Sequence, residues 1–270
     1  MGCGGSKPAT RGSDYFREAR TGDIVLFQSH GSMANLVRCA TCSNYSHIGM
    51  IVRLRASLSA TSSDVLYLWH APSDKIERVP DMLSDPPRAK DGPQLISLRR
   101  LIHYLDHDTV VTVRKVRLPD DHPWNTEDGA VAADSPLMQW MRVEHTKIYE
   151  RDRVQLARSV YDGPFGANTA DTSQYFCSEL QAETYKQFRV MRTRLPSNEF
   201  VPMDFADGGS ANARWAKDVG FGREYEVRGP VVARSQAQRD TFDAGMTVDD
   251  DIAAEYFMLQ RMESLEDDED

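Results

Sequence analysis

Cys177 stands where a nucleophilic thiol would be expected, at the start of a helical pattern. Leu180, Thr184 and Phe188 follow it at steps of three and four residues, so the spacing predicts a helix that begins near the cysteine. The polar residues at 171–173 are suitable caps for that helix. The free N–H groups and the positive dipole end of a helix start favour thiolate over thiol. A cysteine is also a common small hydrophobe of protein cores, so this position alone does not identify an enzyme.

Two histidines could supply the groups that a cysteine nucleophile needs. His47 opens an apolar segment that runs to Val52, and His70 closes the segment 65–70. A polar ring beside an apolar strand has to be hydrogen bonded or to face a cleft. If the two strands are neighbours, His47 can act as the base and His70 can orient it, as in a Cys–His–polar triad. The residues alone leave a second interpretation open, in which all three are structural.

Short apolar segments between turns predict the elements that would position these side chains. Strands are expected at 24–27, 45–52, 65–70 and 110–118, and helices at 33–40, 98–105, 154–161, from Cys177 onward and at 252–265. Alternation along the third strand places Leu66, Leu68 and His70 on one face. Loops or extended chain are expected at 81–93, 120–134 and 195–205, where proline and glycine interrupt the apolar pattern.

Composition and charge restrict the class of protein. The chain has 270 residues, of which 40% are hydrophobic and 27% charged, as in one substantial globular domain with appendages. Ten Asp and Glu residues against one Arg at 249–270 account for the formal charge of −9, so the remainder is near neutral and does not suggest nucleic-acid binding. No apolar run is long enough to span a membrane. The helix expected in the acidic tail could dock on the body or on a protein partner.

The four cysteines do not suggest a disulfide framework. Cys39 and Cys42 form a single CxxC pair. A zinc site would need two more ligands and a redox site a thioredoxin-like context, so neither is favoured. We therefore expect no metal and no cofactor.

The first residues match a lipidation signal. Met-Gly-x-x-x-Ser is the pattern for N-myristoylation of Gly2, and Cys3 beside it is a candidate for palmitoylation. Stable attachment takes two signals, because one myristoyl chain binds a membrane only marginally. The pattern predicts a lipidated leader at 1–20 that holds the chain on the cytoplasmic face of a membrane in a eukaryotic cell.

Three segments together resemble a known family. They are GDIVL at 22–26, YSHIGM at 45–50 and YFCSEL at 175–180. In this order they resemble the permuted NlpC/P60 papain-like superfamily, closest to its YiiX/YebB-like group with poxviral relatives, over about residues 20–205. In that branch the histidine strand precedes the cysteine helix. The resemblance implies an α+β, circularly permuted papain-like (NlpC/P60) fold, in which an antiparallel sheet packs against helices and the nucleophilic cysteine lies at a helix N-terminus.

The resemblance also implies roles for the three candidate residues. Cys177 matches the nucleophile and His47 the general base. His70 takes the place of a third polar residue that is often Glu in this group. An imidazole at this position keeps a polar partner for His47 but makes the pairing neutral or pH-dependent. The backbone N–H of Cys177 is expected to be one oxyanion donor.

A second, weaker correspondence concerns substrate contacts. The loop at 163–166 resembles a Gly-x-Pro-Tyr loop of the family, with Phe165 where Tyr is common. If the family's Tyr hydroxyl contacts substrate, Tyr161 or Tyr175 would have to replace it here.

The implied organisation is the leader at 1–20, a catalytic domain at 21–205 with an insertion at about 119–145, and a C-terminal extension at 206–270. The implied function is a membrane-tethered cysteine hydrolase that cleaves an amide, ester or thioester bond through an acyl-Cys177 intermediate. A peptide, a lipid or a lipidated protein would be its substrate. Acyl transfer by the same chemistry, and a catalytically silent lipid-anchored scaffold, are the alternatives.

The leader makes a testable prediction. Gly2→Ala should abolish membrane fractionation, because an unmyristoylated chain would seldom reach the membrane where Cys3 is acylated. Cys3→Ser should leave a partial, rapidly exchanging membrane pool. Fractionation of cells that express the tagged wild type and both variants measures this, with Cys39→Ser as the matched cysteine control. A Gly2→Ala variant that stays on membranes would show that the lipid-anchor interpretation is wrong.

Overall fold

A mainly antiparallel sheet organises the chain, as the computed structural model shows for residues 10–11, 18–29, 43–55, 65–72, 79–105, 109–149, 174–175 and 177–228. Its seven strands run in the order β1-β9-β6-β2-β3-β4-β5. They are β1 (Thr10–Arg11), β9 (Gly220–Arg228), β6 (Val110–Arg117), β2 (Ile24–Gln28), β3 (His47–Leu54), β4 (Val65–His70) and β5 (Gln94–Ser97). Only β1 pairs parallel to its neighbour. The helices α3 (Leu98–Tyr104), α4 (Pro136–Glu144) and α6 (Cys177–Gln187) complete an α+β fold.

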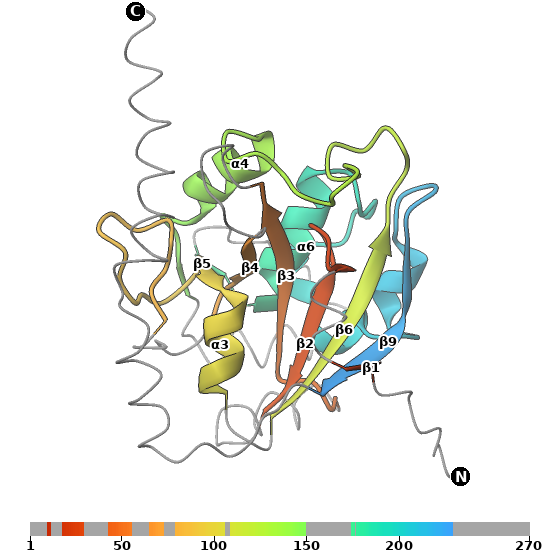
Figure 1. The fold of residues 1–270 in the computed structure, drawn as a ribbon. Helices are drawn as coiled ribbons and strands as arrows, with labels where there is room; N and C mark the ends of the chain where they lie inside the picture. The colour runs from red at the N-terminus through yellow and green to blue at the C-terminus, as the bar shows by residue number, and fades with distance from the viewer. Residues whose placement is uncertain are drawn as a thin grey trace, which may run out of the picture.

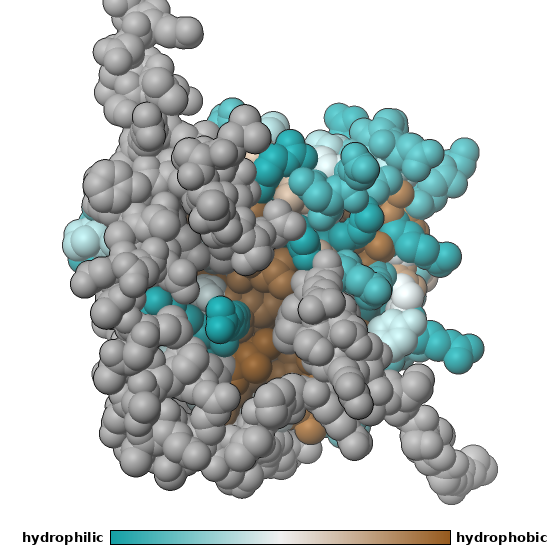
Figure 2. Space-filling model, in the orientation of Figure 1, coloured by the Kyte–Doolittle hydropathy of each residue, from teal (hydrophilic) through white to brown (hydrophobic). Residues whose placement is uncertain are grey.

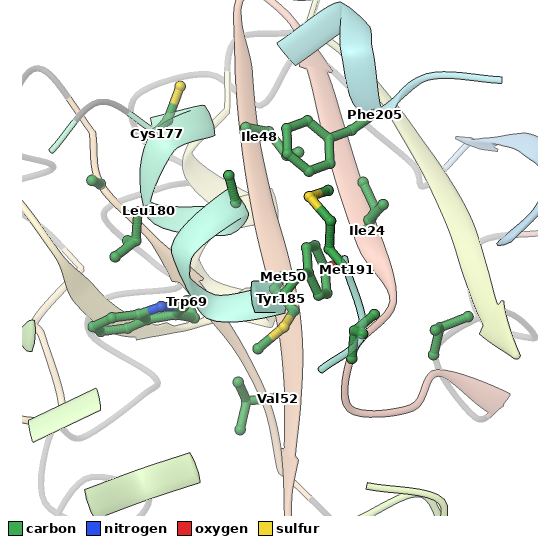
Figure 3. Close-up of a cluster of buried hydrophobic side chains, with 14 of the residues drawn as sticks. Ile24, Ile48, Met50, Val52, Trp69, Cys177, Leu180, Tyr185, Met191 and Phe205 are labelled. Carbon is green, nitrogen blue, oxygen red and sulfur yellow. The ribbon is translucent and has the colours of Figure 1, made fainter. Parts of the chain in front are cut away.

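The central strand β3 is buried on both faces because it lies between β2 and β4 and apolar clusters cover it on both sides. Ile48, Met50 and Val52 belong to the cluster that includes α6, and Figure 3 shows them along β3 beside that helix. Ile51 belongs to the cluster that includes residues of α3. The two helices lie on opposite sides of the sheet (Figure 1). On the α3 side, Figure 2 shows apolar groups gathered over the middle of the sheet.

Buried polar contacts fix α6 against β4. The Trp69 indole Nε1–H donates to Thr184 Oγ1 at 3.2 Å, and the Gln181 side-chain amide donates to the Trp69 carbonyl at 3.0 Å. Both helix residues are fully buried. Polar groups in a core need partners of this kind. These contacts therefore fix both the position of α6 along β4 and the distance between the helix and the strand.

The turn before β2 has a structural reason for its Gly-Asp sequence. Gly22 adopts a left-handed φ of +98°, and a Cβ there would meet the Trp124 ring at 3.1 Å. Asp23 is buried, and its carboxylate accepts from the backbone N–H groups of Arg20 at 3.0 Å and Val116 at 2.7 Å. The turn therefore joins β2 to β6 at the end of the sheet distant from Cys177.

The predicted strands at 24–27, 45–52, 65–70 and 110–118 and the predicted helices at 98–105 and from Cys177 are confirmed, with ends that move by one or two residues. Alternation on β4 is confirmed as well, because Leu68 and Trp69 belong to different clusters. The predicted helices at 33–40, 154–161 and 252–265 lie outside the described residues.

The loop prediction at 120–134 is confirmed, and the prediction at 195–205 is wrong in detail. The helix α4 follows the first loop; Ser135 caps it through its hydroxyl, and Pro136 is at N1. The range 195–205, expected to be extended, contains the 3-10 turns η1 (Ser197–Glu199) and η2 (Pro202–Phe205). A further turn, η3 (Ser210–Ala213), precedes β9. Short polar segments with proline at the first helical position begin turns rather than strands.

The sheet continues past residue 205. β9 lies beyond the range covered by the family resemblance, yet it pairs with β6 along most of that strand. Gly220, Gly222 and alternating charges conceal the apolar period of this strand, which explains why the sequence does not indicate it. No helix in the described part of the chain is long and apolar enough to cross a membrane.

Candidate active site

Cys177 is the first residue of α6, as the sequence predicts. Its side chain is 7% exposed and belongs to the same apolar cluster as Ile48 and Leu180. Figure 3 shows it at the start of the helix, beside the beginning of β3. The thiol therefore lies at one end of the sheet, on the side that α6 covers.

The open end of the β3–β4 ladder lies next to this thiol. Ile51 N–H donates to the Asp23 carbonyl on the β2 side, so strand alternation turns the N–H of Ile48 toward β4. The register that pairs Met50 with Trp69 would place Ile48 opposite Ala71, one residue beyond the end of β4. The N–H of Ile48 is thus available at the ladder's end.

Burial and hydrogen bonding act in opposite directions on the thiol. Burial in the apolar cluster raises the pKa of Cys177 to about 11, although the backbone N–H groups of Ile48, Ser178 and Cys177 itself lower that pKa. The helix start does favour thiolate, as the sequence suggests, but desolvation is the larger effect. In this conformation Cys177 is a neutral thiol at physiological pH, which corrects the expectation of a thiolate.

His47 and His70 meet across β3 and β4. Nε2 of His47 and Nδ1 of His70 are 2.9 Å apart, a hydrogen-bonding distance. His47 also lies opposite Phe27 in the ladder with β2, and the two rings are 5.5 Å apart. Phe27 and Leu68 belong to the cluster on the α3 side of the sheet. The histidine pair therefore occupies the α3 side, by the alternation of β3 and β4.

The three candidate catalytic residues are close in the fold but are not all in contact. His47 is the first residue of β3, and the following residue, Ile48, directs its N–H at the cysteine. However, the imidazole of His47 faces the α3 side of the sheet, whereas Cys177 belongs to the apolar cluster on the α6 side. The hydrogen bonds of the described residues include His47 with His70 and none between His47 and Cys177.

Burial also keeps the histidines neutral. It lowers the pKa of His47 to about 4 and that of His70 well below its usual value. Burial thus raises the pKa of the thiol and lowers that of the base, so proton transfer from Cys177 to His47 is unfavourable in this arrangement. The observed conformation is therefore uncharged, with the proton on sulfur.

Gly49 allows β3 and β4 to approach at the histidine pair. A Cβ on Gly49 would lie 2.7 Å from a methyl carbon of Leu68 on the neighbouring strand. Because that distance is shorter than real Cβ contacts, a side chain at this position would force the strands or Leu68 to move. The glycine of the SHxG segment thus leaves room for the Leu68 side chain beside the histidine pair.

The other predicted site residues are only partly within the described chain. Tyr175 lies in β8 (Gln174–Tyr175), which pairs parallel with β7 (Ile148–Tyr149), two residues before Cys177. Tyr161, Phe165, Gly2 and Cys3 lie outside the described residues, as do Cys39, Cys42 and the acidic tail. Among the described residues, no group of three or more His, Cys, Asp or Glu side chains could hold a metal ion.

The structure adds two residues that sequence reasoning missed. The N–H of Ile48 contributes to the thiol's surroundings through backbone geometry, for which the sequence carries no signal. Gln94 is fully buried opposite His70 on β5. A glutamine at the start of an apolar strand was a possible signal, because a buried amide needs hydrogen-bond partners.

Comparison with known proteins gives little further information. No protein-family model matches the sequence, and no curated protein matches it significantly. The structure is similar to the crystal structure of the metalloprotein YiiX from Escherichia coli O157:H7, at 16% sequence identity and a TM-score of 0.33. That similarity covers 77% of this chain and 99% of the other. It is weak and says nothing about the chemistry of the site.

The pKa of Cys177 predicts how the thiol reacts with iodoacetamide. Because the thiol is largely neutral at pH 7, labelling of Cys177 should rise about tenfold per pH unit between pH 7 and 9 and should not level off below about pH 11. Peptide mass spectrometry resolves Cys177 from the other cysteines, and Cys42 serves as the internal control. A labelling rate that is constant between pH 5 and 8 would instead reveal a thiolate–imidazolium pair.

Proposed function

We propose that the chain is a cysteine hydrolase in which Cys177 forms an acyl intermediate. The observation that supports this proposal lies at the start of β3. His47, its first residue, is hydrogen bonded to His70. The N–H of the next residue, Ile48, donates to the thiol of Cys177 at the start of α6. A nucleophile, a base, a group that orients the base and backbone donors are the parts that acyl transfer to sulfur requires.

In the proposed reaction His47 acts in turn as base, acid and base again. His47 Nδ1 takes the proton from the Cys177 thiol, because Nε2 is already bonded to His70. The sulfur attacks the carbonyl carbon of the substrate, and the carbonyl oxygen becomes an oxyanion. The imidazolium then gives its proton to the departing amine, alcohol or thiol. Water activated by His47 attacks the acyl-Cys177 thioester, and the acid leaves with the thiol regenerated.

The backbone N–H groups around the sulfur suit a second role. Ile48 and Ser178 donate toward the sulfur in the free protein. Once the sulfur is bonded to carbon it carries no charge, so these donors could turn to the oxyanion beside it. Loss of one such donor costs enzymes about 10²–10³ in kcat.

Catalysis requires His47 and Cys177 to meet. Catalytic hydrogen bonds are often long in free enzymes and shorten in the substrate complex. Here the thiol lies at the open end of the β3–β4 ladder rather than over the middle of the sheet, so rotation of the two side chains around the start of β3 is the shortest route to contact. We propose that substrate binding drives this change and that the free protein is the inactive, uncharged form.

We further propose that the fold is the permuted papain-like one. The order of elements along the chain supports this proposal. The strands β2, β3 and β4 are consecutive and antiparallel, and α6 follows them in the chain and packs on β3. Lipidation of Gly2 and Cys3 would place the site on the cytoplasmic face of a membrane, where a lipidated protein, a lipid or a peptide is the substrate. The three cavities found among the described residues are not lined by Cys177, His47 or His70. Their shapes therefore do not distinguish among these substrates.

Turnover of a p-nitrophenyl ester, an acyl thioester and a fluorogenic peptide amide tests the proposal. Cys177→Ala should abolish turnover, and His47→Ala should lower kcat/KM by about 10²–10⁴, the usual contribution of general acid–base catalysis. Mass spectrometry after acid quench should find the acyl group on the peptide that contains Cys177. Cys39→Ala is the matched control and should leave turnover unchanged.

The same assay separates the alternatives. An acyltransferase would pass the acyl group to an added amine or alcohol in preference to water. Turnover that survives Cys177→Ala would refute the nucleophile. A wild-type protein with neither turnover nor an acyl adduct on all three substrates would favour the silent scaffold.

A further inference from the structure

A cavity of about 540 Å³ lies at the C-terminal end of α6, away from the candidate active site. Residues from the ranges 119–123, 187–192 and 216–219 line it. The 11 residues of α6 rise about 1.5 Å each, so roughly 15 Å of helix separates this cavity from Cys177 at the other end. A volume in this range is usual for the binding site of a small molecule. The cavity is therefore a candidate ligand site that is separate from the thiol.

Three cationic side chains line this cavity. Arg189, Arg192 and Lys217 are exposed, and in the described part of the chain their side chains make no hydrogen bond or ion pair. The carboxylates of Asp121 and Asp218 line the same cavity, but among the described residues neither forms an ion pair with the cations. Like charges that share a cavity repel each other and produce a positive potential there. The three cations therefore attract an anionic ligand.

Backbone hydrogen bonds hold the three cations in place. Arg189 follows α6 with a left-handed φ of +59°. The N–H of Arg192 donates to the Arg214 carbonyl at 2.7 Å, and the N–H of Ala216 donates to the Val190 carbonyl at 2.9 Å. The third cation follows Ala216 directly. Because these bonds join the two segments that carry the cations, a ligand has to order only the side chains, which lowers the cost of binding.

Capping of α6 does not explain the cations. Lys and Arg side chains near a helix end often hydrogen bond to its last carbonyl groups. At the end of α6 those carbonyls already have other donors, which are backbone N–H groups and Nε2 of His122. The bonded carbonyls are those of Thr184, Tyr185, Lys186 and Phe188. The cationic groups of Arg189, Arg192 and Lys217 are thus left to bind something else.

The mixture of charges in the cavity indicates the kind of anion. Guanidinium groups bind phosphate with two parallel hydrogen bonds, and an ammonium group adds a point charge. The two carboxylates repel a ligand that is negative throughout, such as an acidic peptide, but they can accept hydrogen bonds from hydroxyl groups. We propose that the cavity binds a phosphorylated polyol, with the phosphate at Arg189, Arg192 and Lys217 and hydroxyls at Asp121 and Asp218.

Two sources share this chemistry. One is the headgroup of a phosphoinositide lipid, and the other is a soluble phosphate ester of a sugar or an inositol. The site does not depend on the proposed hydrolase, because it involves neither Cys177 nor the histidine pair.

Titration of the unacylated, ¹⁵N-labelled full chain with inositol trisphosphate and with glucose phosphate tests the proposal. Calorimetry should find saturable binding of at least one of them, and the NMR signals of backbone amides at 187–192 and 216–219 should shift with the same saturation. Unphosphorylated inositol is the control ligand and should cause no shift. Absence of saturable binding by both phosphate esters would overturn the proposal.

Matched variants locate the binding. Arg192→Gln and Lys217→Gln should each weaken affinity about tenfold or more, because each removes a charge-assisted hydrogen bond to phosphate. Both side chains are exposed, so the fold should tolerate these changes. Arg223→Gln removes the same charge from an exposed arginine of β9 outside the cavity and should bind as the wild type does. Equal weakening by all three variants would show nonspecific attraction and refute the site.

Vesicles distinguish the two sources. Phosphatidylcholine vesicles that contain phosphatidylinositol bisphosphate are compared with vesicles that carry the same charge as phosphatidylserine. A preference for the phosphoinositide vesicles that Arg192→Gln removes would assign the site to a lipid headgroup. Saturable binding of a soluble phosphate ester without that preference would assign it to a free ligand. Tighter binding of a peptide of residues 249–270 than of either phosphate ester would overturn the proposal in favour of an acidic peptide.

Discussion

The antiparallel pairing of β3 with β4 determines where every group of the candidate site lies. It brings Nε2 of His47 to 2.9 Å from Nδ1 of His70, and it packs the Leu68 side chain over Gly49. Because β4 ends at His70, the same pairing leaves the N–H of Ile48 without a ladder partner next to Cys177. The apolar clusters on both faces then hold β3 in place and bury Cys177 and His70 near its start.

Exclusion of water has an electrostatic consequence. It raises the pKa of the thiol and lowers the pKa of both histidines, so the free site holds no charge. An uncharged thiol reacts slowly with ordinary electrophiles, so in the proposed hydrolase Cys177 would not be acylated by unrelated carbonyl compounds before substrate binds. Hydrogen bonds then matter more than charges, so the tautomer of His70 decides whether Nδ1 of His47 is free to accept a proton.

Sequence reasoning found the strands that carry His47 and His70 and the helix that Cys177 begins, because apolar period and spacing are local signals. It could not find the side of β3 to which each residue points relative to α6, since that depends on which face the helix covers. Sequence reasoning also overestimated how far the helix start lowers the pKa of Cys177. The position of a residue at a helix start can be predicted from sequence, but desolvation depends on how the core packs around the thiol. β9 was missed because glycines and charged residues interrupt its apolar pattern. α4 was missed although Leu137, Met138 and Met141 follow helical spacing after a Ser-Pro start.

The most direct test of the account is a crystal structure of the protein with Cys177 alkylated by iodoacetamide, whose acetamide group imitates a bound acyl amide. The account predicts that the imidazole of His47 leaves the Phe27 side and lies within about 3.5 Å of the modified sulfur or the acetamide group, still hydrogen bonded to His70. A His47 ring that stays beside Phe27, across β3 from a fully modified Cys177, would contradict the proposal that these residues act together.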